Sequence, residues 1–149
     1  MSRFRGEFNY TIDEKNRVNI PAKFRKSLVP EANETFAICR APGGCLRAYP
    51  LDAWERYEDE LASIPQKPET LQHLRLLRST LTDSKLDVQG RISLTAKQIE
   101  IAGMAKNVTL VGHNGYIEIW DTGRYQTYLQ GVEDFDQVFF QSVEASLKI

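Results

Sequence analysis

The sequence predicts a mainly β fold with short helices, of the α+β class, built from one unit that occurs twice. Two observations carry this prediction. Short segments alternate between apolar and polar side chains, as half-buried strands do. An Asp-x-x-x-Arg segment also occurs at 13–17 and again at 87–91, an offset of 74 residues, and a similar apolar pattern follows each copy. With 149 residues, of which 42% are hydrophobic, the chain is long enough to bury a core.

In the first copy, strands are expected over 8–12 and 17–20, because apolar and polar residues alternate in both segments. The Asp-x-x-x-Arg segment between them then forms the tip of a hairpin. Asn16 and Gly90 hold the same place in the two tips, and both residue types tolerate a positive φ. The alignment therefore predicts one backbone shape for both tips.

A short helix and a second hairpin follow each tip. Pro21 suits the first turn of a helix over 21–28, and Thr95 is the expected N-cap at the equivalent place in the second copy. Segment 44–49 then matches segment 115–120 at an offset of 71 residues. The hairpins predicted from this match pair 36–40 with 45–49, and 108–112 with 116–120.

Further helices are expected between the copies and at the C-terminus. Asp52 followed by Glu55 indicates a capping box that opens a helix over 52–63. A second amphipathic helix joins the copies through Leu71, Leu74, Leu77 and Leu81. A spacing of four residues predicts a C-terminal helix that packs on the body or on a neighbour through Phe135, Phe139, Val143 and Leu147.

The expected organisation has four parts. They are a first module over 7–54, a helical connection over 55–80, a second module over 81–124 and a helical tail over 125–149. Because no segment is apolar enough for a spanning helix or a secretory signal, we expect an intracellular, cytoplasmic protein.

The cysteines, Cys39 and Cys45, flank a Pro-Gly-Gly turn, where small strand residues need no chemical role. The histidines, His73 and His113, are far away in the sequence, which argues against a metal site. No Ser-His, Cys-His or paired-carboxylate arrangement indicates an enzyme. We therefore expect no catalytic residue, no metal and no cofactor.

The net charge of −1 hides an uneven distribution. Residues 1–26 hold seven basic and three acidic residues, a net charge of +4, whereas 116–149 hold two basic and six acidic ones, a net charge of −4. The bulk charge excludes a histone-like or ribosomal-type basic protein. A basic hairpin tip can reach DNA phosphates and bases. Basic residues that simply solvate a surface are the alternative.

The Asp and Arg of each tip have two possible roles. An exposed ion pair contributes only about 0–1 kcal/mol, which is a weak reason to place it twice. A carboxylate can instead hold the arginine in the rotamer that donates two hydrogen bonds to guanine. We expect structural roles for Asp13 and Asp87 and a ligand-facing role for Arg17. Arg91 is expected to serve mainly the scaffold, because the second tip lacks the lysine that Lys15 supplies.

Nearly the whole chain, about 3–125, resembles the MraZ family of bacterial transcriptional regulators. The resemblance rests on FRGEFNYTIDEKNRVNIPAKFR, on the later DVQGRISL and VTLVGHNGYIEIWD, on the leading Phe4-Arg5-Gly6 and on the two Asp-x-x-x-Arg motifs. One departure is Asn16, where the family usually has glycine. We expect a small effect on the shape of the tip and no loss of function.

The resemblance implies two swapped-hairpin modules of the AbrB type in tandem, which form a pseudo-symmetric unit. It also implies a repressor of its own promoter at the head of the division and cell-wall gene cluster. The partners implied are double-stranded promoter DNA with short direct repeats and further copies of the chain in a ring, without a membrane or a small-molecule substrate. Such a regulator is expected in the cytoplasm, associated with the nucleoid.

On this hypothesis Arg17 reads bases, and the residues expected on phosphates are Lys15, Lys23, Arg3 and Arg5. The expected turn and structural residues are Asp13, Asn16, Asp87, Gly90 and Arg91. Two other hypotheses stay open. One is a non-catalytic scaffold whose ring presents the acidic C-terminal face, and the other is an enzyme whose Asp–Arg pair handles a phosphorylated small molecule.

Overall fold

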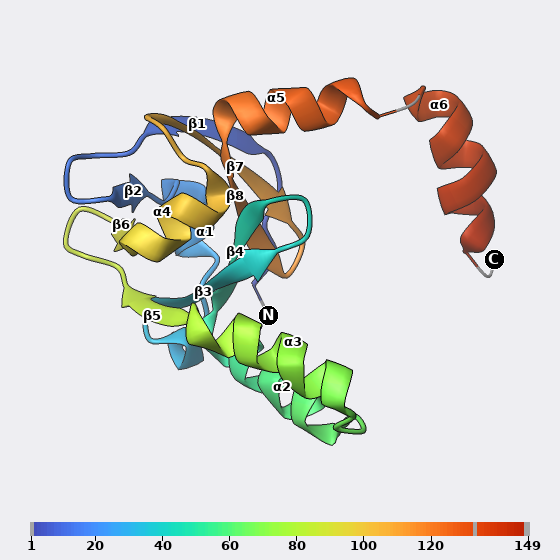
Figure 1. Cartoon of the computed structure of the whole chain (residues 1–149). Helices are drawn as coiled ribbons and strands as arrows, with labels where there is room; N and C mark the ends of the chain where they lie inside the picture. The colour runs from blue at the N-terminus through green and yellow to red at the C-terminus, as the bar shows by residue number, and fades with distance from the viewer. Residues whose placement is uncertain (1, 133, 148–149) are drawn as a thin grey trace.

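The computed structural model of the chain describes residues 2–132 and 134–147, and its two halves have the same order of strands and α-helices (Figure 1). The first half consists of β1 (Glu7–Thr11), β2 (Arg17–Asn19), α1 (Ala22–Lys26), η1 (Pro30–Ala32), β3 (Thr35–Ala41), β4 (Cys45–Pro50), α2 (Leu51–Ser63) and α3 (Pro68–Ser79). The second half consists of β5 (Thr82–Lys85), β6 (Arg91–Ser93), α4 (Ala96–Ala102), β7 (Asn107–His113), β8 (Tyr116–Asp121), α5 (Thr122–Gln130), α6 (Phe135–Val138), η2 (Phe139–Val143) and η3 (Glu144–Ser146). The mixed α+β class predicted from the sequence is confirmed. Within the described ranges, no helix is both long and apolar enough to cross a membrane.

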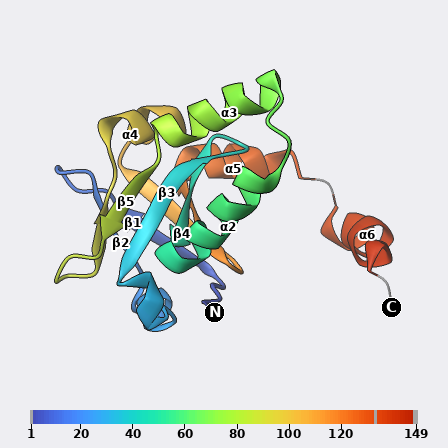
Figure 2. The same ribbon diagram turned by 90° about the horizontal axis from the view of Figure 1, so that it is seen from below.

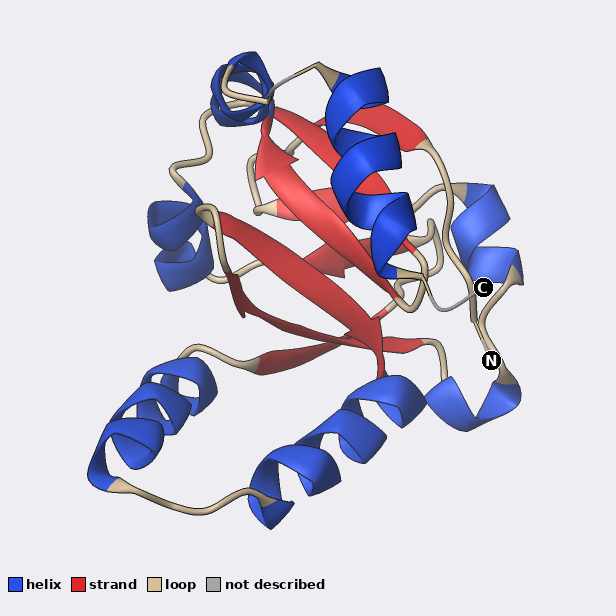
Figure 3. Cartoon of the chain, turned by 90° about the vertical axis from the view of Figure 1, so that its right-hand side faces the viewer, coloured by secondary structure: helices blue, strands red, loops and turns tan. Residues whose placement is uncertain are grey.

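Six strands form one antiparallel sheet in the order β1-β7-β8-β4-β3-β5, while β2 and β6 form a separate two-stranded ribbon. Figure 3 shows the strands in the middle of the molecule with helices around them. The two halves exchange their first strands. β1 pairs with β7 of the second half, with Phe8 opposite Leu110, and β5 pairs with β3 of the first half, with Ser84 opposite Phe36. Because each half lends an edge strand to the other, the halves are interlaced. The four-part division along the chain stays a prediction.

The sheet buries apolar side chains on both faces, since successive residues of a strand point to opposite sides. Phe36 and Ile38 belong to the larger apolar cluster, which includes residues of the β2–β6 ribbon, α1 and α4. Ala37 and Cys39 belong to a smaller cluster that contains Trp54 of α2. Leu77 of α3 also packs against this cluster, and Figures 1 and 2 show α2 and α3 joined by a loop at their far ends.

The predicted hairpin strands are confirmed to within two residues at each end. Thr95 is the N-cap of α4, and the box is closed by Gln98: Thr95 Oγ1 accepts from the Gln98 backbone N–H at 3.1 Å, and Gln98 Oε1 accepts from the Thr95 backbone N–H at 3.0 Å. The helix predicted over 21–28 is shorter, and Pro21 precedes it as the N-cap. The second connecting helix ends at Ser79. Leu81 therefore lies beyond the helix, although it packs against the smaller apolar cluster.

The capping box predicted at Asp52 and Glu55 is wrong. β4 runs directly into α2, so the helix begins at Leu51 with Pro50 as its N-cap and has no capping side chain. Asp52 therefore lies inside the first turn, where its Oδ2 accepts from Arg56 Nη1 at 3.4 Å. In the second half the cap is Asp121, whose side chain accepts from the Arg124 backbone N–H at 3.0 Å.

The C-terminal tail is helical, as predicted, but it does not lie on the body in this structure. α6 continues into the π-helical η2 and the short η3, and Figure 1 shows this segment standing apart from the sheet. Phe135 is 64% exposed and Leu147 is 59% exposed. Of the predicted tail, Glu133, Lys148 and Ile149 lie outside the described residues. Packing on a neighbouring copy stays a prediction.

Gly112 lies where the N-terminal segment runs antiparallel beside β7, and we expect Gly112→Ala to destabilise the fold by about 1–3 kcal/mol, the usual range for overpacking. Its N–H donates to the Gly6 carbonyl at 2.8 Å. A methyl group at Gly112 would stand 2.5 Å from the backbone nitrogen of Arg5 and the carbonyl carbon of Phe4, and backbone cannot rotate away. The measurement is the free energy of unfolding in urea.

Gly115→Ala is the matched control, because a methyl group there would meet no atom within 4 Å. It is expected to change the free energy of unfolding by less than about 0.5 kcal/mol. Equal effects of the two substitutions would show that the N-terminal segment does not pack on β7.

Candidate nucleic-acid interface

The β2–β6 ribbon has one buried and one outward face. Val18 lies opposite Ile92 in the register, and both are fully buried. Because side chains alternate along a strand, the other residues of the ribbon share the outward face, and they are Arg17, Asn19, Arg91 and Ser93. The structure thus brings together the arginines of both tips, which are far apart in the sequence.

A carboxylate fixes the first tip. Asp13 Oδ1 accepts from the backbone N–H groups of Lys15 at 2.9 Å and Arg17 at 2.8 Å, and Oδ2 accepts from Arg17 Nε at 2.7 Å. The hydrogen bond from the Arg17 backbone is the largest cause that lowers the pKa of Asp13, against the opposing effect of desolvation. These hydrogen bonds therefore contribute stability at neutral pH, and the contribution is lost only as the pH falls through this lowered pKa.

The second tip repeats this geometry. Asp87 Oδ1 accepts from the backbone N–H groups of Gln89 and Arg91 at 2.9 Å, and Oδ2 accepts from Arg91 Nε at 2.8 Å. One difference separates the two arginines. Arg91 Nη1 also lies 3.5 Å from Asp13 Oδ2, and its side chain is 20% exposed, against 30% for Arg17. Arg91 is therefore held by two carboxylates, whereas the Nη groups of Arg17 have no protein partner among the described residues.

Each tip is also held by the other half. Asn16 and Gly90 have φ values of 59° and 77°, so both tips use the left-handed backbone predicted for them. The Asn16 carbonyl accepts from Leu94 N–H at 2.9 Å, and the Gly90 carbonyl accepts from Ile20 N–H at 2.9 Å. This reciprocal pair of hydrogen bonds fixes the two tips relative to one another.

The other predicted cations lie in two places. Lys15 is exposed on the first tip, and Lys23 is exposed on α1, which begins shortly after β2. Arg3 and Arg5 are exposed on either side of Phe4, whose backbone pairs with Asn114 in the turn between β7 and β8. β1 separates these two arginines from the tip, so the structure does not bring them to the ribbon.

Arg25 is a candidate that sequence reasoning missed. Its Nε donates to the Ile20 carbonyl at 3.0 Å, and its guanidinium covers Gly90, where a methyl group would stand 2.7 Å from it. Arg25, which belongs to the first half, thus lies against the tip of the second half. Arg25 and Gly90 are far apart in the sequence, so no local sequence pattern predicts their contact.

The cysteines offer no reactive group. Cys39 and Cys45 are buried free thiols, and desolvation raises the pKa of Cys39 to about 11 and that of Cys45 to about 12. Both thiols are therefore protonated at neutral pH, and the thiolate is the form that reacts or binds a metal. Among the described residues, His, Cys, Asp and Glu form no cluster of three or more that could hold a metal ion.

Comparisons with known proteins agree across both halves. A family model described as "MraZ protein, putative antitoxin-like" matches residues 3–75 and 79–144. The protein called "Transcriptional regulator MraZ" in Leuconostoc citreum is 36% identical over 137 residues, 91% of this chain and 93% of that protein. The protein of the same description in Desulfitobacterium hafniense is 38% identical over 132 residues, 88% of this chain and 90% of that protein. With two matched repeats and relatives of this similarity over almost its whole length, the chain belongs to the MraZ family.

Proposed function

We propose that the chain is a sequence-specific, DNA-binding transcriptional regulator. The observation that carries the proposal is the outward face of the β2–β6 ribbon, which presents Arg17 and Arg91 between two carboxylate-fixed tips. A two-stranded ribbon fits the major groove of B-DNA, where arginine donates two hydrogen bonds to guanine O6 and N7. The relatives are described as transcriptional regulators, and MraZ regulators are not enzymes, so the enzyme hypothesis is set aside.

In this proposal Asp13 orients Arg17, and the free Nη groups of Arg17 read a base edge. Lys15 and Lys23 contact phosphates on either side of the ribbon. Arg3 and Arg5 contact phosphates at a separate place, because β1 lies between them and the tip. The second tip, with Asp87, Gly90 and the more enclosed Arg91, serves mainly to support the first.

We also propose that several copies form a ring on direct repeats upstream of the gene for this chain, and repress that promoter at the head of the division and cell-wall cluster. One tip offers few contacts, whereas several identical tips on equally spaced repeats gain avidity, often by about 10²–10⁴-fold. The exchange of β1 and β5 between the halves supports the swapped-hairpin, AbrB-like description of the modules. A cytoplasmic, nucleoid-associated location follows from this function.

Footprinting on the DNA upstream of the gene, combined with the mass of the free particle, tests the proposal. We expect protection at regularly spaced repeats, a mass of several chains, and an affinity that falls steeply as the salt concentration rises, because phosphate contacts release counterions. Uniform protection without a preferred site would contradict sequence-specific recognition.

The scaffold hypothesis is the second candidate, and the exposed apolar tail favours it. Phe135, Phe140 and Val143 are each more than half exposed, and the charged residues of segment 135–147 are both acidic. A scaffold predicts that the full chain retains no DNA at low salt, while a variant lacking the first tip still captures a protein partner. Retention of promoter DNA by the full chain excludes it as the main function.

A further inference from the structure

The C-terminal segment 135–147 has the place in the second half that α3 has in the first. α2 is followed by four residues, 64–67, and then by α3, while α5 is followed by four residues, 131–134, and then by α6. α3 packs on the smaller apolar cluster through Leu77. Segment 135–147 instead leaves four apolar side chains more than half exposed, Phe135, Phe140, Val143 and Leu147, while Val138 and Phe139 are half-buried. Among the residues that the structure describes, this segment stands apart from the sheet and from α3 (Figure 1).

An apolar groove of about 520 Å³ lies between α3, the turn that joins β3 to β4 and Ile64 at the end of α2. It is lined by Ile64, Leu74, Leu76 and Leu77 together with Arg40 and His73, and none of its lining residues is acidic. Leu76 is 49% exposed and Ile64 is 43% exposed, so the groove opens to solvent. A half-open apolar groove with a cation at its rim is typical of a site for an amphipathic helix.

The charges of the two surfaces are complementary. Segment 135–147 carries Asp136 and Glu144 and no basic residue, and Asp134 immediately precedes it. Arg40 lines the groove, and α3 adds Arg75 and Arg78, with Glu69 as its single carboxylate. Opposite charges at the rim favour docking and fix its direction.

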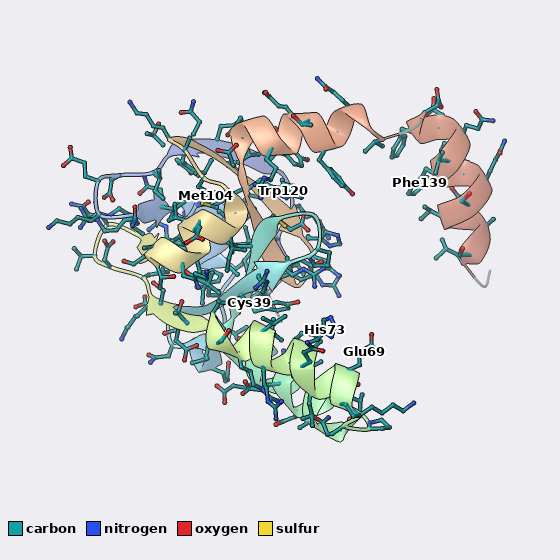
Figure 4. The ribbon with its side chains drawn as sticks, viewed as in Figure 1. Cys39, Glu69, His73, Met104, Trp120 and Phe139 are labelled. Carbon is teal, nitrogen blue, oxygen red and sulfur yellow. The ribbon has the colours of Figure 1, made fainter. Side chains whose placement is uncertain are left out.

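The two surfaces lie apart on one molecule. Figure 4 shows Phe139 on the outlying tail and His73 on α3, at separate places. In Figures 1 and 2 the tail also lies on the side of the molecule away from the tips. Docking the tail into the groove of a second copy leaves the tail of that copy free for a third. Such a head-to-tail interface closes into a ring when the rotation between copies allows it.

We infer that segment 135–147 of one chain docks in the α3 groove of a second copy and that this contact closes the ring. The inference rests on the self-association proposed above and names the surfaces that produce it. Burial of the phenylalanines against Leu76 and Ile64 supplies the apolar contact. The acidic side chains of the tail then lie next to Arg40 and the arginines of α3.

Substitutions on each surface test the contact through the mass of the particle. Phe140→Asp on the tail and Leu76→Asp in the groove are each expected to raise the concentration at half-assembly by about tenfold or more, because each places a charge in an apolar contact. The matched controls are Gln141→Asp and Gln72→Asp, which add the same charge at exposed positions of the same segments outside the groove lining. A chain that ends at Gly131 is expected to lose the ring and still to unfold in one cooperative transition, which shows that loss of the ring is not loss of the fold.

Cross-linking decides between two copies and one. A Phe140→Cys chain and a size-tagged Leu76→Cys chain are mixed and oxidised, and we expect a disulfide-linked pair of mixed size. The native thiols do not compete, because Cys39 and Cys45 are buried. A bond found only within one chain of the double variant would show that the tail folds back on its own body, which overturns the inference.

The outcomes separate this inference from the proposed function. A full chain that is monomeric at every concentration contradicts the proposed ring itself. A full chain that forms a ring which Phe140→Asp, Leu76→Asp and the shortened chain all retain contradicts only the docking of the tail.

Discussion

Arg17→Ala is expected to weaken binding to promoter DNA by about tenfold or more, because each well-aligned arginine–guanine pair contributes about 1–3 kcal/mol of discrimination. The loss multiplies in an assembly that engages several repeats at once. The fold is expected to survive, since the Asp13–Arg17 ion pair is partly exposed and such pairs contribute about 0–1 kcal/mol. Titration of repeat-containing DNA at several salt concentrations, together with the melting temperature, measures both effects.

Three further variants define what Arg17 does. Arg17→Lys keeps the charge but loses the planar fork, so it is expected to recover phosphate binding without the preference for the repeats. Arg91→Ala is expected to cost less affinity, because two carboxylates already hold Arg91. Arg56→Ala removes an arginine from α2, away from the ribbon, and controls for net charge. Our assignment of Arg17 is wrong if Arg17→Ala binds as tightly as the unmodified chain with the same salt dependence.

Phe4→Ala is expected to lower the free energy of unfolding by about 3–5 kcal/mol, the range for truncating a buried phenylalanine. Phe4 is 1% exposed, and its ring meets Phe24 edge-on with centroids 5.2 Å apart. Its backbone also exchanges two hydrogen bonds with Asn114, at 2.7 and 3.1 Å. Urea unfolding of the dissociated chain measures the change.

The matched control is Phe135→Ala, which removes the same atoms from a side chain that is 64% exposed. It is expected to change the free energy of unfolding by less than about 0.5 kcal/mol. A loss below about 1 kcal/mol for Phe4→Ala would mean that the N-terminal segment is not part of the core. The expected result would assign Phe4 of the Phe4-Arg5-Gly6 motif a structural role in the core. Arg3 and Arg5 on either side of it stay exposed.

Sequence periodicity and residue type predicted most helices and strands. They gave a wrong helix cap where β4 runs directly into α2. Alternation located the hairpin strands, and the residue types at Asn16 and Gly90 predicted the positive φ of both tips. The capping box predicted at Asp52 was wrong because Pro50 is both the last residue of β4 and the N-cap of α2. The spacing of Asp52 and Glu55 suggested a later start of the helix.

The candidate site was predictable in its parts but not as a whole. The pattern located both Asp-x-x-x-Arg tips, because a carboxylate that accepts hydrogen bonds from its own turn makes contacts within four residues. The pattern also grouped Arg3 and Arg5 with the tip on the basis of sequence proximity. In the structure β1 is extended between them, so closeness in sequence becomes separation in space.

Residue type and short spacing were enough to predict the repeat, the α+β class, the shape of each tip and the family. Three features depend on the folded chain: the pairing of β1 with β7 and of β5 with β3, the β2–β6 ribbon that puts Arg17 and Arg91 on one face, and the position of Arg25 over Gly90. A strand selects its partner by the apolar surface that the pairing buries, and that surface comes from residues far away in the chain. The alternation of apolar and polar residues along a strand does not indicate which strand it pairs with. The interlaced sheet and the face shared by Arg17 and Arg91 therefore could not be predicted from it.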